Sequence, residues 1–166
     1  RALRDELTGI FNRRHLDAEL PAQVAHCRER GAALSVALLD LDHFKLINDR
    51  LGHAAGDEAL RFVTEVIGRN VRGMDLFGRY GGEEFMLVMP DTSADKATML
   101  CNRVREAVRA TRPQPDASFF AHDPITLSAG VAELSGDETP EELVGRADVA
   151  LYAAKSGGRN QVCKAQ

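Results

Sequence analysis

The sequence predicts an α+β domain in which helices cover a mixed β-sheet, and three patterns support this fold class. Residues 34–39 form an apolar run with one serine, which is typical of a strand buried on both faces. Residues 76–80 and 85–89 are strand-like and flank Gly81 and Gly82, which predicts an antiparallel hairpin. Apolar residues recur at helical spacing between these strands. Helices interleaved with an antiparallel hairpin indicate a mixed sheet with helical cover.

The first part of the chain predicts a helix, a strand and a second helix. We expect a helix over residues 13–30, in which Pro21 would introduce a kink or a break. The buried strand follows at about residues 33–41. Asp42 is placed to cap a short helix that continues through Ile47.

The middle of the chain predicts a helix on each side of the hairpin. Residues 52–56 contain two glycines and predict a turn before a longer helix. The apolar face of that helix consists of Leu60, Val63 and Ile67. After the hairpin, Thr92 and Asp95 have the spacing of a capping box. The helix that they would begin carries an apolar stripe of Ala97, Leu100, Val104 and Ala107.

The last third of the chain predicts a loop, a strand, a helix and a short final strand. Two prolines place the clearest loop at residues 112–116, and residues 125–131 have the pattern of a strand. Thr139 followed by Pro140 is a strong helix start, and this helix is expected to end at a glycine pair. Residues 161–163 would form the last strand. This order of elements is typical of a ferredoxin-like or polymerase-palm sheet.

Length and composition indicate one globular domain that spans residues 1–166. The chain is 44% hydrophobic and 28% charged, which suffices for one core. Its net charge of −4 provides no general basic surface for duplex nucleic acid, so we expect no nucleic-acid partner. No apolar run approaches the roughly 20 residues of a membrane span, and residues 1–20 are too charged for a signal peptide. We expect no membrane contact by this domain.

The cysteines favour a cytoplasmic location. Cys27, Cys101 and Cys163 are odd in number, far apart and without a C-x-x-C pair. This pattern indicates neither a disulfide framework nor a zinc site, and reduced thiols are the simplest interpretation. The domain could still belong to a longer protein that is tethered to a membrane.

Two acidic positions predict a metal and nucleotide site at one rim of the sheet. Asp40 ends the buried strand, and Glu83 follows Gly81 and Gly82 at the hairpin turn. Carboxylates at the end of a buried strand are costly unless a positive or donating group meets them. If the strand lies beside the hairpin, the two acids converge and would suit a hard divalent cation such as magnesium, with a nucleotide. The glycines would tolerate positive φ and let an anion approach the backbone.

At this point the chain resembles a GGDEF domain, the catalytic module of diguanylate cyclases, over nearly its whole length. One short motif would be weak, but the ordered set with its spacings is highly specific. The motifs that carry the resemblance are Asp5-Glu6-Leu7-Thr8-Gly9 with Asn12-Arg13-Arg14, Asp40-Leu41-Asp42-His43-Phe44-Lys45 with Asn48-Asp49, Gly52-His53 with Gly56-Asp57, Gly81-Gly82-Glu83-Glu84-Phe85, Ser128-Ala129-Gly130-Val131, Ala147-Asp148 with Ala150-Leu151-Tyr152, Lys155 and Gly158-Arg159-Asn160.

The resemblance implies a nucleotidyl cyclase-like fold and the condensation of two GTP molecules into cyclic di-GMP with loss of pyrophosphate. Each domain of an antiparallel homodimer would present one GTP. Asp40, the carbonyl of Leu41 and Glu83 would hold Mg²⁺ or Mn²⁺, two ions in each half-site. Glu84 would be a supporting acid. Either Glu83 or a metal-bound water would accept the proton of the ribose 3′-hydroxyl, and the sequence does not choose between them.

The resemblance also places substrate-binding residues. Lys45, Lys155 and Arg159 fall on the triphosphate positions, so that the residues expected to carry catalysis are Asp40, Glu83, Glu84, Lys155 and Arg159. Asn48 and Asp57 would select guanine, since an amide and a carboxylate complement its edge. Phe44 would pack in the core near the nucleotide, and Gly81 and Gly82 would contact the substrate. Taken alone, Lys155 and Arg159 would also suit a helix C-terminus, and Asn48 and Asp57 would suit a cap and a turn.

Regulation is implied by two further features. Arg72, Asp75 and Arg103 fall where family members carry an inhibitory site for the product, cyclic di-GMP. Residues 1–8 resemble the end of a helix that connects the domain to an upstream sensor or receiver region. Two rivals remain open: a module that binds GTP or cyclic di-GMP without turnover, and a palm-type cyclase that makes another cyclic nucleotide.

Overall fold

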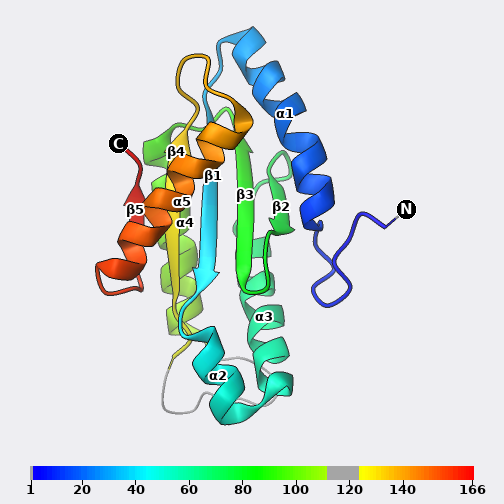
Figure 1. Cartoon of the computed structure of the whole chain (residues 1–166), viewed down its shortest axis with the longest axis vertical. Coiled ribbons are helices and arrows are strands. Elements are labelled where there is room, and N and C mark those ends of the chain that lie inside the picture. Colours follow the sequence, from blue (N-terminus) through cyan, green and yellow to red (C-terminus); the bar gives the residue numbers. More distant parts are fainter. Residues whose placement is uncertain (1, 112–123) are drawn as a thin grey trace.

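The computed structural model describes residues 2–111 and 124–166, which form one mixed sheet with helices on both faces (Figure 1). In chain order the elements are α1 (Arg13–Arg30), β1 (Leu34–Leu41), α2 (Phe44–Leu51), α3 (His53–Gly68), β2 (Leu76–Arg79), β3 (Glu84–Pro90), α4 (Ala94–Ala110), β4 (Leu127–Glu133), α5 (Pro140–Ser156) and β5 (Val162–Lys164). The strand order is β2-β3-β1-β4-β5. All neighbours are antiparallel except β4 and β5. The predicted α+β class is therefore confirmed.

The central strand β1 sets the register of the sheet and is buried along all eight residues. At one end Leu34 lies opposite Pro90 of β3, and at the other end Asp40 lies opposite Glu84. On its other side, Asp40 faces Ser128 of β4. The Asp40 end of β1 points toward α2 in Figure 1. Since side chains alternate between the faces of a strand, Asp40 shares a face with Leu38.

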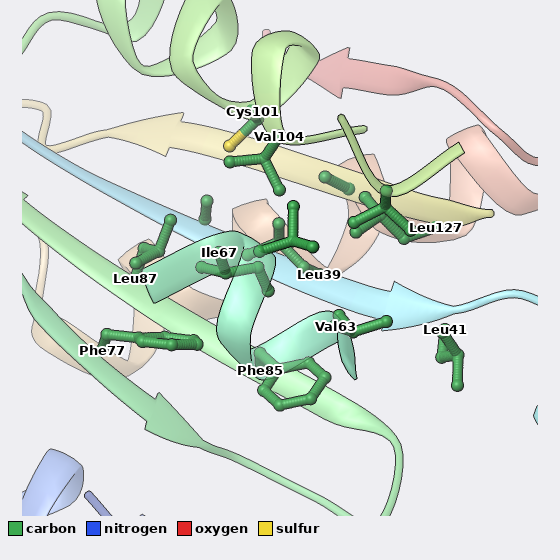
Figure 2. Packing of buried hydrophobic residues seen from close by; sticks show 14 of the residues in the cluster. Leu39, Leu41, Val63, Ile67, Phe77, Phe85, Leu87, Cys101, Val104 and Leu127 are labelled. Carbon is green, nitrogen blue, oxygen red and sulfur yellow. The ribbon is translucent and has the colours of Figure 1, made fainter. Parts of the chain in front are cut away.

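One face of the sheet packs against α3 and α4. The odd-numbered side chains of β1 and β3, such as Leu39 and Phe85, meet Val63 of α3 and Val104 of α4 (Figure 2). The rings of Phe77 and Phe85 lie 6.0 Å apart and extend this core toward the edge strand β2. This face therefore forms the larger of the two cores. The hairpin of β2 and β3 packs on it through Phe77 and Phe85.

The other face packs against α1 and α5. Leu16 and Leu20 of α1 join Leu38 of β1 and Met86 of β3 in a second core. Gly130 of β4 lies so close to α5 that a Cβ there would stand 2.2 Å from two backbone atoms of that helix. A glycine is thus required for α5 to approach the sheet.

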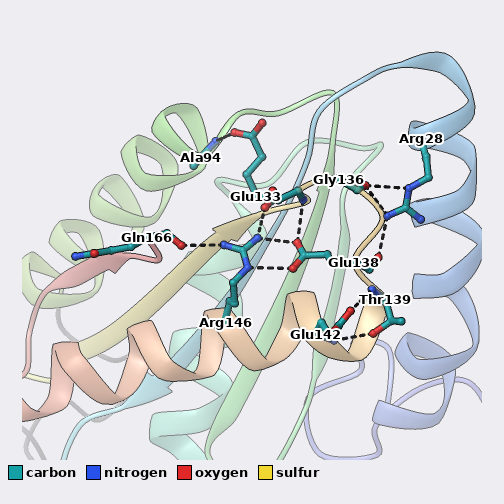
Figure 3. Close-up of polar contacts among 10 residues, drawn as sticks. Arg28, Ala94, Glu133, Gly136, Glu138, Thr139, Glu142, Arg146 and Gln166 are labelled. Carbon is teal, nitrogen blue, oxygen red and sulfur yellow. Dashed lines mark hydrogen bonds and ion pairs between the residues drawn. The ribbon is translucent and has the colours of Figure 1, made fainter.

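A polar network fixes the start of α5 at the end of the sheet opposite Asp40 (Figure 3). Thr139 and Glu142 form the predicted capping box, and Pro140 is the first helical residue. Arg146 pairs with Glu138 at 2.6 Å, and this pair lowers the pKa of the Glu138 carboxyl through hydrogen bonding. The guanidinium of Arg28 donates to two carbonyl oxygens of the same turn. The network therefore ties α1 and α5 together.

Several predicted boundaries are confirmed and several are wrong. The helix over residues 13–30 is present as one element with Pro21 inside it. The predicted cap at Asp42 is wrong, because the residue before α2 is His43 and it makes no side-chain cap. The turn expected at residues 52–56 is also wrong, since α2 runs on to Leu51 and only Gly52 separates it from α3. The packing of α2 against α3 favours this longer helical pair over a glycine-rich turn.

The capping box expected at Thr92 and Asp95 is wrong by one residue. Ser93 is the cap of α4 and accepts from the Lys96 amide, while the Thr92 hydroxyl donates to the Pro90 carbonyl. The strand predicted at residues 125–131 lies at Leu127–Glu133, and the last strand at Val162–Lys164. The loop predicted at residues 112–116 lies within residues 112–123, outside the described part of the chain.

Residues 2–8 are not helical, so a connecting helix at this position is wrong for the described residues. The Asp5 carboxylate accepts hydrogen bonds from the Thr8 amide and hydroxyl, and Arg4 forms an isolated antiparallel β-bridge with Phe11. The three cysteines have free thiols, and burial raises the pKa of Cys101 to about 12. Within residues 2–111 and 124–166, no helix is both long enough and apolar enough to cross a membrane.

Candidate active site

The structure brings Asp40 and Glu83 together at one rim of the sheet. The Leu41 amide donates to the Glu83 carbonyl at 3.1 Å, which fixes the end of β1 to the hairpin turn. The carboxyl groups of Asp40 and Glu83 are close enough for the charge of Asp40 to raise the pKa of Glu83. This is the convergence that the sequence predicted. Two segments more than forty positions apart thus place their oxygens where one ion could contact both.

The Asp40 carboxyl is buried and incompletely paired. It is 8% exposed, and its Oδ1 has no hydrogen-bond donor among the described residues. Lys155 Nζ stands 2.8 Å from Oδ1 as an ion pair whose angles do not meet those of a hydrogen bond. Burial raises the pKa of Asp40 although Lys155 acts in the opposite direction. Because burial outweighs the ion pair with Lys155, an additional cation at this carboxylate would be favourable.

Glu83 and Glu84 have different surroundings despite being neighbours. Burial, and then the charge of Asp40, raises the pKa of Glu83. Burial, Asp40 and Asp148 raise the pKa of Glu84 to about 6. Glu84 points to the α1 and α5 face, where it lines a cavity of about 700 Å³. The other residues of that cavity include Arg13, Asp17, Leu20, Leu38, Tyr80, Val144 and Asp148.

A smaller cavity of about 370 Å³ lies between the start of α2, the hairpin turn and the end of α5. Five residues predicted for catalysis or substrate binding are among those that line it. The lining consists of His43, Phe44, Lys45, Leu46, Asp49, Glu83, Lys155 and Arg159. The cavity therefore brings one predicted metal-binding acid together with all three of the cations predicted for phosphate.

The three cations come from two helical ends. Lys45 lies in the first turn of α2, is exposed, and pairs with Asp49 at 2.8 Å. Lys155 lies in the last turn of α5, and Arg159 follows in the loop to β5. His43 has a left-handed backbone with φ of 57°, and no side chain caps the start of α2. The backbone amides in the first turn of α2 are therefore available to bind a phosphate group, as the amides at helix N-termini commonly do.

Asn48 and Asp57, predicted to select guanine, lie on α2 and α3 and are not among the residues that line this cavity. Asn48 Oδ1 is buried and has no hydrogen-bond partner among the described residues. Gly56 of α3 makes room for it, because a Cβ there would lie 1.9 Å from Asn48 Oδ1 and 3.3 Å from the Phe44 ring. The sequence analysis did not predict that position 56 requires a glycine. Only the knowledge that residue 56 is buried against α2 could have indicated it.

Neither glycine of the hairpin turn uses positive φ. Gly81 and Gly82 fall outside the left-handed region, so that part of the prediction is wrong. A Cβ on Gly82 would meet no atom within 4 Å, which leaves its backbone open to an approaching group. Arg79 also holds this turn, since its guanidinium donates to the Gly82 carbonyl at 2.7 Å and pairs with Asp5 at 3.1 Å.

The residues of the predicted inhibitory site lie at the other end of β3. Arg72 pairs with Asp75 at 2.9 Å and also donates to the Pro90 carbonyl at 3.0 Å. The Asp75 side chain is fully buried and also accepts from the Arg72 amide. Arg103 is separate from this pair and donates to Asn70 Oδ1 at 3.1 Å. The structure thus brings two of the three residues together.

The rim residues fit a divalent cation that is shared with a substrate. In the described residues no three His, Cys, Asp or Glu side chains gather into a complete metal cage. Magnesium commonly uses one or two carboxylates together with water and substrate phosphates, rather than an all-protein cage. The buried, donor-free Oδ1 of Asp40 beside Glu83 suits such a partial set of oxygen ligands.

Comparisons with known proteins agree with this geometry. The family model described as "Diguanylate cyclase, GGDEF domain" matches residues 2–161. The response regulator PleD of Caulobacter vibrioides is 42% identical over 162 residues, which are 97% of this chain and 36% of PleD. The diguanylate cyclase DgcP of Pseudomonas aeruginosa is 40% identical over 98% of this chain and 24% of its own length. The chain thus spans about a third or less of these relatives.

Solved structures are similar over the whole domain. The GGDEF domain of DgcB from Caulobacter crescentus, determined in complex with c-di-GMP, has a TM-score of 0.94 and 37% identity, covering 100% of this chain and 94% of that one. An active GGEEF domain of a diguanylate cyclase from Vibrio cholerae has a TM-score of 0.86 and 35% identity, covering 93% and 97% of the two chains. The match therefore covers the fold of nearly the whole domain.

Proposed function

The chain belongs to the GGDEF domain family, and we propose that it is a diguanylate cyclase module that condenses two GTP molecules into cyclic di-GMP and pyrophosphate. The observation that carries this proposal is the meeting of the buried Asp40 carboxyl with Glu83 and Lys155 beside a cavity lined by three cations. Its relatives over nearly the whole chain are named as diguanylate cyclases. Fold and site therefore support the same activity.

Asp40 and Glu83, with the carbonyl of Leu41, would hold Mg²⁺ or Mn²⁺, two ions in each half-site. The bound cation would neutralise phosphate charge and favour ionisation of the attacking hydroxyl. Glu84 lines the larger cavity and not the one that contains the three predicted cations, so we assign it a supporting role through its charge beside Asp40. The chain contributes alignment and charge rather than a covalent intermediate.

Lys45, Lys155 and Arg159 would bind the triphosphate, together with the free amides at the start of α2. Lys155 would have to share its charge between Asp40 and the phosphates, since it already stands 2.8 Å from Asp40 Oδ1. Asn48 and Asp57 would bind the guanine edge, for which the unpartnered Oδ1 of Asn48 is a ready acceptor. These groups would present the α-phosphorus of one GTP to the 3′-hydroxyl of another.

Two GTP molecules need two facing sites, so the active form would be an antiparallel homodimer with input from an upstream sensor or receiver region. Arg72, Asp75 and Arg103 would form an inhibitory site for cyclic di-GMP. The product would have to exchange with the contacts that Arg72 makes to Asp75 and Pro90. A cytoplasmic location would give the domain access to GTP.

The decisive experiment is incubation with GTP and magnesium, followed by chromatographic separation of the nucleotides. We expect cyclic di-GMP from the wild type and loss of at least about 100-fold in rate from Glu83→Gln, because a metal ligand is worth several kcal/mol at a transition state. Glu65→Gln makes the same chemical change on an exposed part of α3 and should retain full activity.

The result also separates the rival functions. GTP bound tightly by the wild type without turnover, at all protein concentrations, would identify a binding module instead of an enzyme. A cyclic nucleotide other than cyclic di-GMP would identify a cyclase of another product. Equal activity of Glu83→Gln and the wild type would contradict the proposal that Glu83 binds the catalytic metal ion.

A further inference from the structure

The loop between α5 and β5 has an unusual backbone. Three consecutive residues, Gly158, Arg159 and Asn160, have positive φ values of 117°, 67° and 48°. Two of them are not glycine, and the left-handed region is unfavourable for arginine although asparagine tolerates it. Such conformations persist where the surrounding structure enforces them, and they occur often at functional sites. One residue of this loop, Arg159, lines the smaller cavity.

A buried carboxylate holds this loop in place. The Asn160 amide donates to Asp42 Oδ2 at 3.0 Å and to Ser128 Oγ at 3.1 Å. Asp42 is only 4% exposed, and its oxygens also accept from the hydroxyls of Ser128 at 2.7 Å and Thr126 at 2.8 Å. Asp42 therefore joins the end of β1, strand β4 and the loop after α5 in one hydrogen-bonded unit.

Further contacts restrict the same loop from other elements. The Arg159 amide donates to the Ala154 carbonyl at 3.0 Å, and Arg105 of α4 donates to Asn160 Oδ1 at 2.9 Å. The Arg159 side chain itself is exposed, and no ion pair or hydrogen bond of its guanidinium occurs within residues 2–111 and 124–166. The structure thus combines a fixed backbone with an unengaged cation.

Asp42 differs from Asp40 although both side chains lie on the same face at the end of β1. Asp40 Oδ1 has an ion pair with Lys155 but no hydrogen bond among the described residues, whereas both oxygens of Asp42 accept hydrogen bonds. A carboxylate with its acceptors occupied has little capacity left for a metal ion. Asp42 is therefore suited to holding protein groups in position.

We infer that Asp42 is a positioning residue that sets the distance between the Arg159 guanidinium and the Asp40 rim. This inference rests on the proposed function, because the role of Arg159 is to bind the triphosphate. Fixing a charged group before the ligand arrives lowers the ordering cost of binding. Without the carboxylate, the strained loop would relax and Arg159 would lose its place at the cavity.

The test is a double-mutant cycle on affinity for a GTP analogue with a methylene group between the α- and β-phosphorus atoms, in magnesium buffer. Asp42→Asn cannot accept from both the Asn160 amide and the two hydroxyls, and should weaken binding roughly tenfold. Arg159→Ala should weaken it by at least as much. In the Arg159→Ala background, Asp42→Asn should have no further effect, because the residue acts through Arg159.

Two buried serines provide a matched control for effects on folding alone. Ser128 donates to Asp42 at 2.7 Å, and Ser35 of the neighbouring strand donates to the Thr92 carbonyl at 2.8 Å, at the opposite end of β1. Each serine→Ala change should lower thermal stability, but only Ser128→Ala should weaken analogue binding. This comparison remains decisive if Asp42→Asn fails to fold.

The outcomes separate the inference from the proposed function. A wild type that does not bind the analogue overturns the proposed function. A wild type that binds it, with an equally tight Asp42→Asn variant, overturns only the role of Asp42. Effects of Asp42→Asn and Arg159→Ala that multiply in the double variant, or equal losses from Ser35→Ala and Ser128→Ala, also overturn it.

Discussion

The two ends of β1 treat their charged groups in opposite ways. At the Asp40 end, burial raises the pKa of three carboxyls, and the ion pair of Asp40 Oδ1 with Lys155 does not offset this burial. At the Leu34 end, Asp75 is fully buried but accepts from Arg72, and Glu138 pairs with Arg146 (Figure 3). The pKa of Glu138 is lowered by this pairing. One end is thus under electrostatic strain, and the other is compensated.

The difference distinguishes chemistry from structure. Acids that stabilise a fold have donors supplied by the chain, and their ionised forms are favoured. Acids that bind a cation are incompletely compensated by the chain itself, and their burial lowers the stability of the free protein. The Arg72 and Asp75 pair shows an intermediate case, since a proposed regulatory site is held closed by its own residues until a ligand competes for them.

The largest expected effect that tests this comparison is at Asp40. Asp40→Asn should reduce cyclic di-GMP formation roughly 100- to 1,000-fold, because it removes a charge that the metal and the transition state require. The free energy of unfolding at pH 7 should be unchanged or increased, since the raised pKa of Asp40 shows that its ionised form costs stability. Steady-state kinetics and urea unfolding measure the two quantities.

The matched change at the other end is Asp75→Asn, and it should give the opposite result. The buried carboxylate accepts from the Arg72 amide and guanidinium, so its loss should lower the free energy of unfolding by about 1–3 kcal/mol. Activity without product should stay within about twofold of wild type at a temperature where both are folded. Inhibition by added cyclic di-GMP should be lost.

A result in which both asparagine variants lose stability to the same extent would contradict the comparison. So would an Asp75→Asn protein that is inhibited as strongly as the wild type, since the pair would then have no regulatory function.

The rim was predictable from sequence because its cause is local. The apolar strand stops at Asp40, and the hairpin turn contains Glu83. Both patterns predict an acid at the end of a strand. Once the two strands pair, their ends must meet, as the register of Asp40 with Glu84 shows. The start of α5 was also local, and Thr139 with Pro140 marked it correctly.

The role of Asp42 could not be predicted, because its partners are distant. Three of its hydrogen bonds come from residues at least 84 positions further along the chain. Local reasoning assigned a helix cap, which is the common use of an aspartate before a helix. Gly52 and Gly56 indicated a turn for the same reason, yet the side chain of Asn48 requires Gly56 inside a helix.

Asn48 Oδ1 is a second buried acceptor that has no hydrogen-bond partner among the described residues. Gly56→Ala would place a methyl group where Asn48 Oδ1 now lies, and so displace the group proposed to read guanine. We expect GTP affinity to fall about tenfold, roughly 1.4 kcal/mol, with a smaller change for ATP. Equilibrium binding of the two nucleotides measures the loss of selectivity.

Gly68→Ala is the control on the same helix. A Cβ at Gly68 would meet no atom within 4 Å, so this change should leave nucleotide binding intact and stabilise the helix by about 0.4–1 kcal/mol. If Gly56→Ala retained wild-type selectivity for guanine, Asn48 would not be the reader.

The smallest effect is the pH dependence of stability, and it compares Glu84 with Glu138. The pKa of Glu84 is raised from 4.5 to about 6 in the folded protein, so the folded state takes up this proton before the unfolded state does. Lowering the pH from 7 to 5 should therefore stabilise the fold through Glu84. The gain is about 1 kcal/mol after allowance for the water that reaches this half-buried group.

Urea unfolding at pH 7 and pH 5 measures this gain as the difference between wild type and Glu84→Gln. Glu138→Gln should show no such difference, because a lowered pKa contributes stability above the unfolded value and loses it only at pH below about 4.5. Glu141→Gln, an exposed acid at the same cavity as Glu84, controls for loss of charge there. If Glu84→Gln and Glu141→Gln changed the pH dependence equally, the strain would not be specific to the Asp40 end of β1.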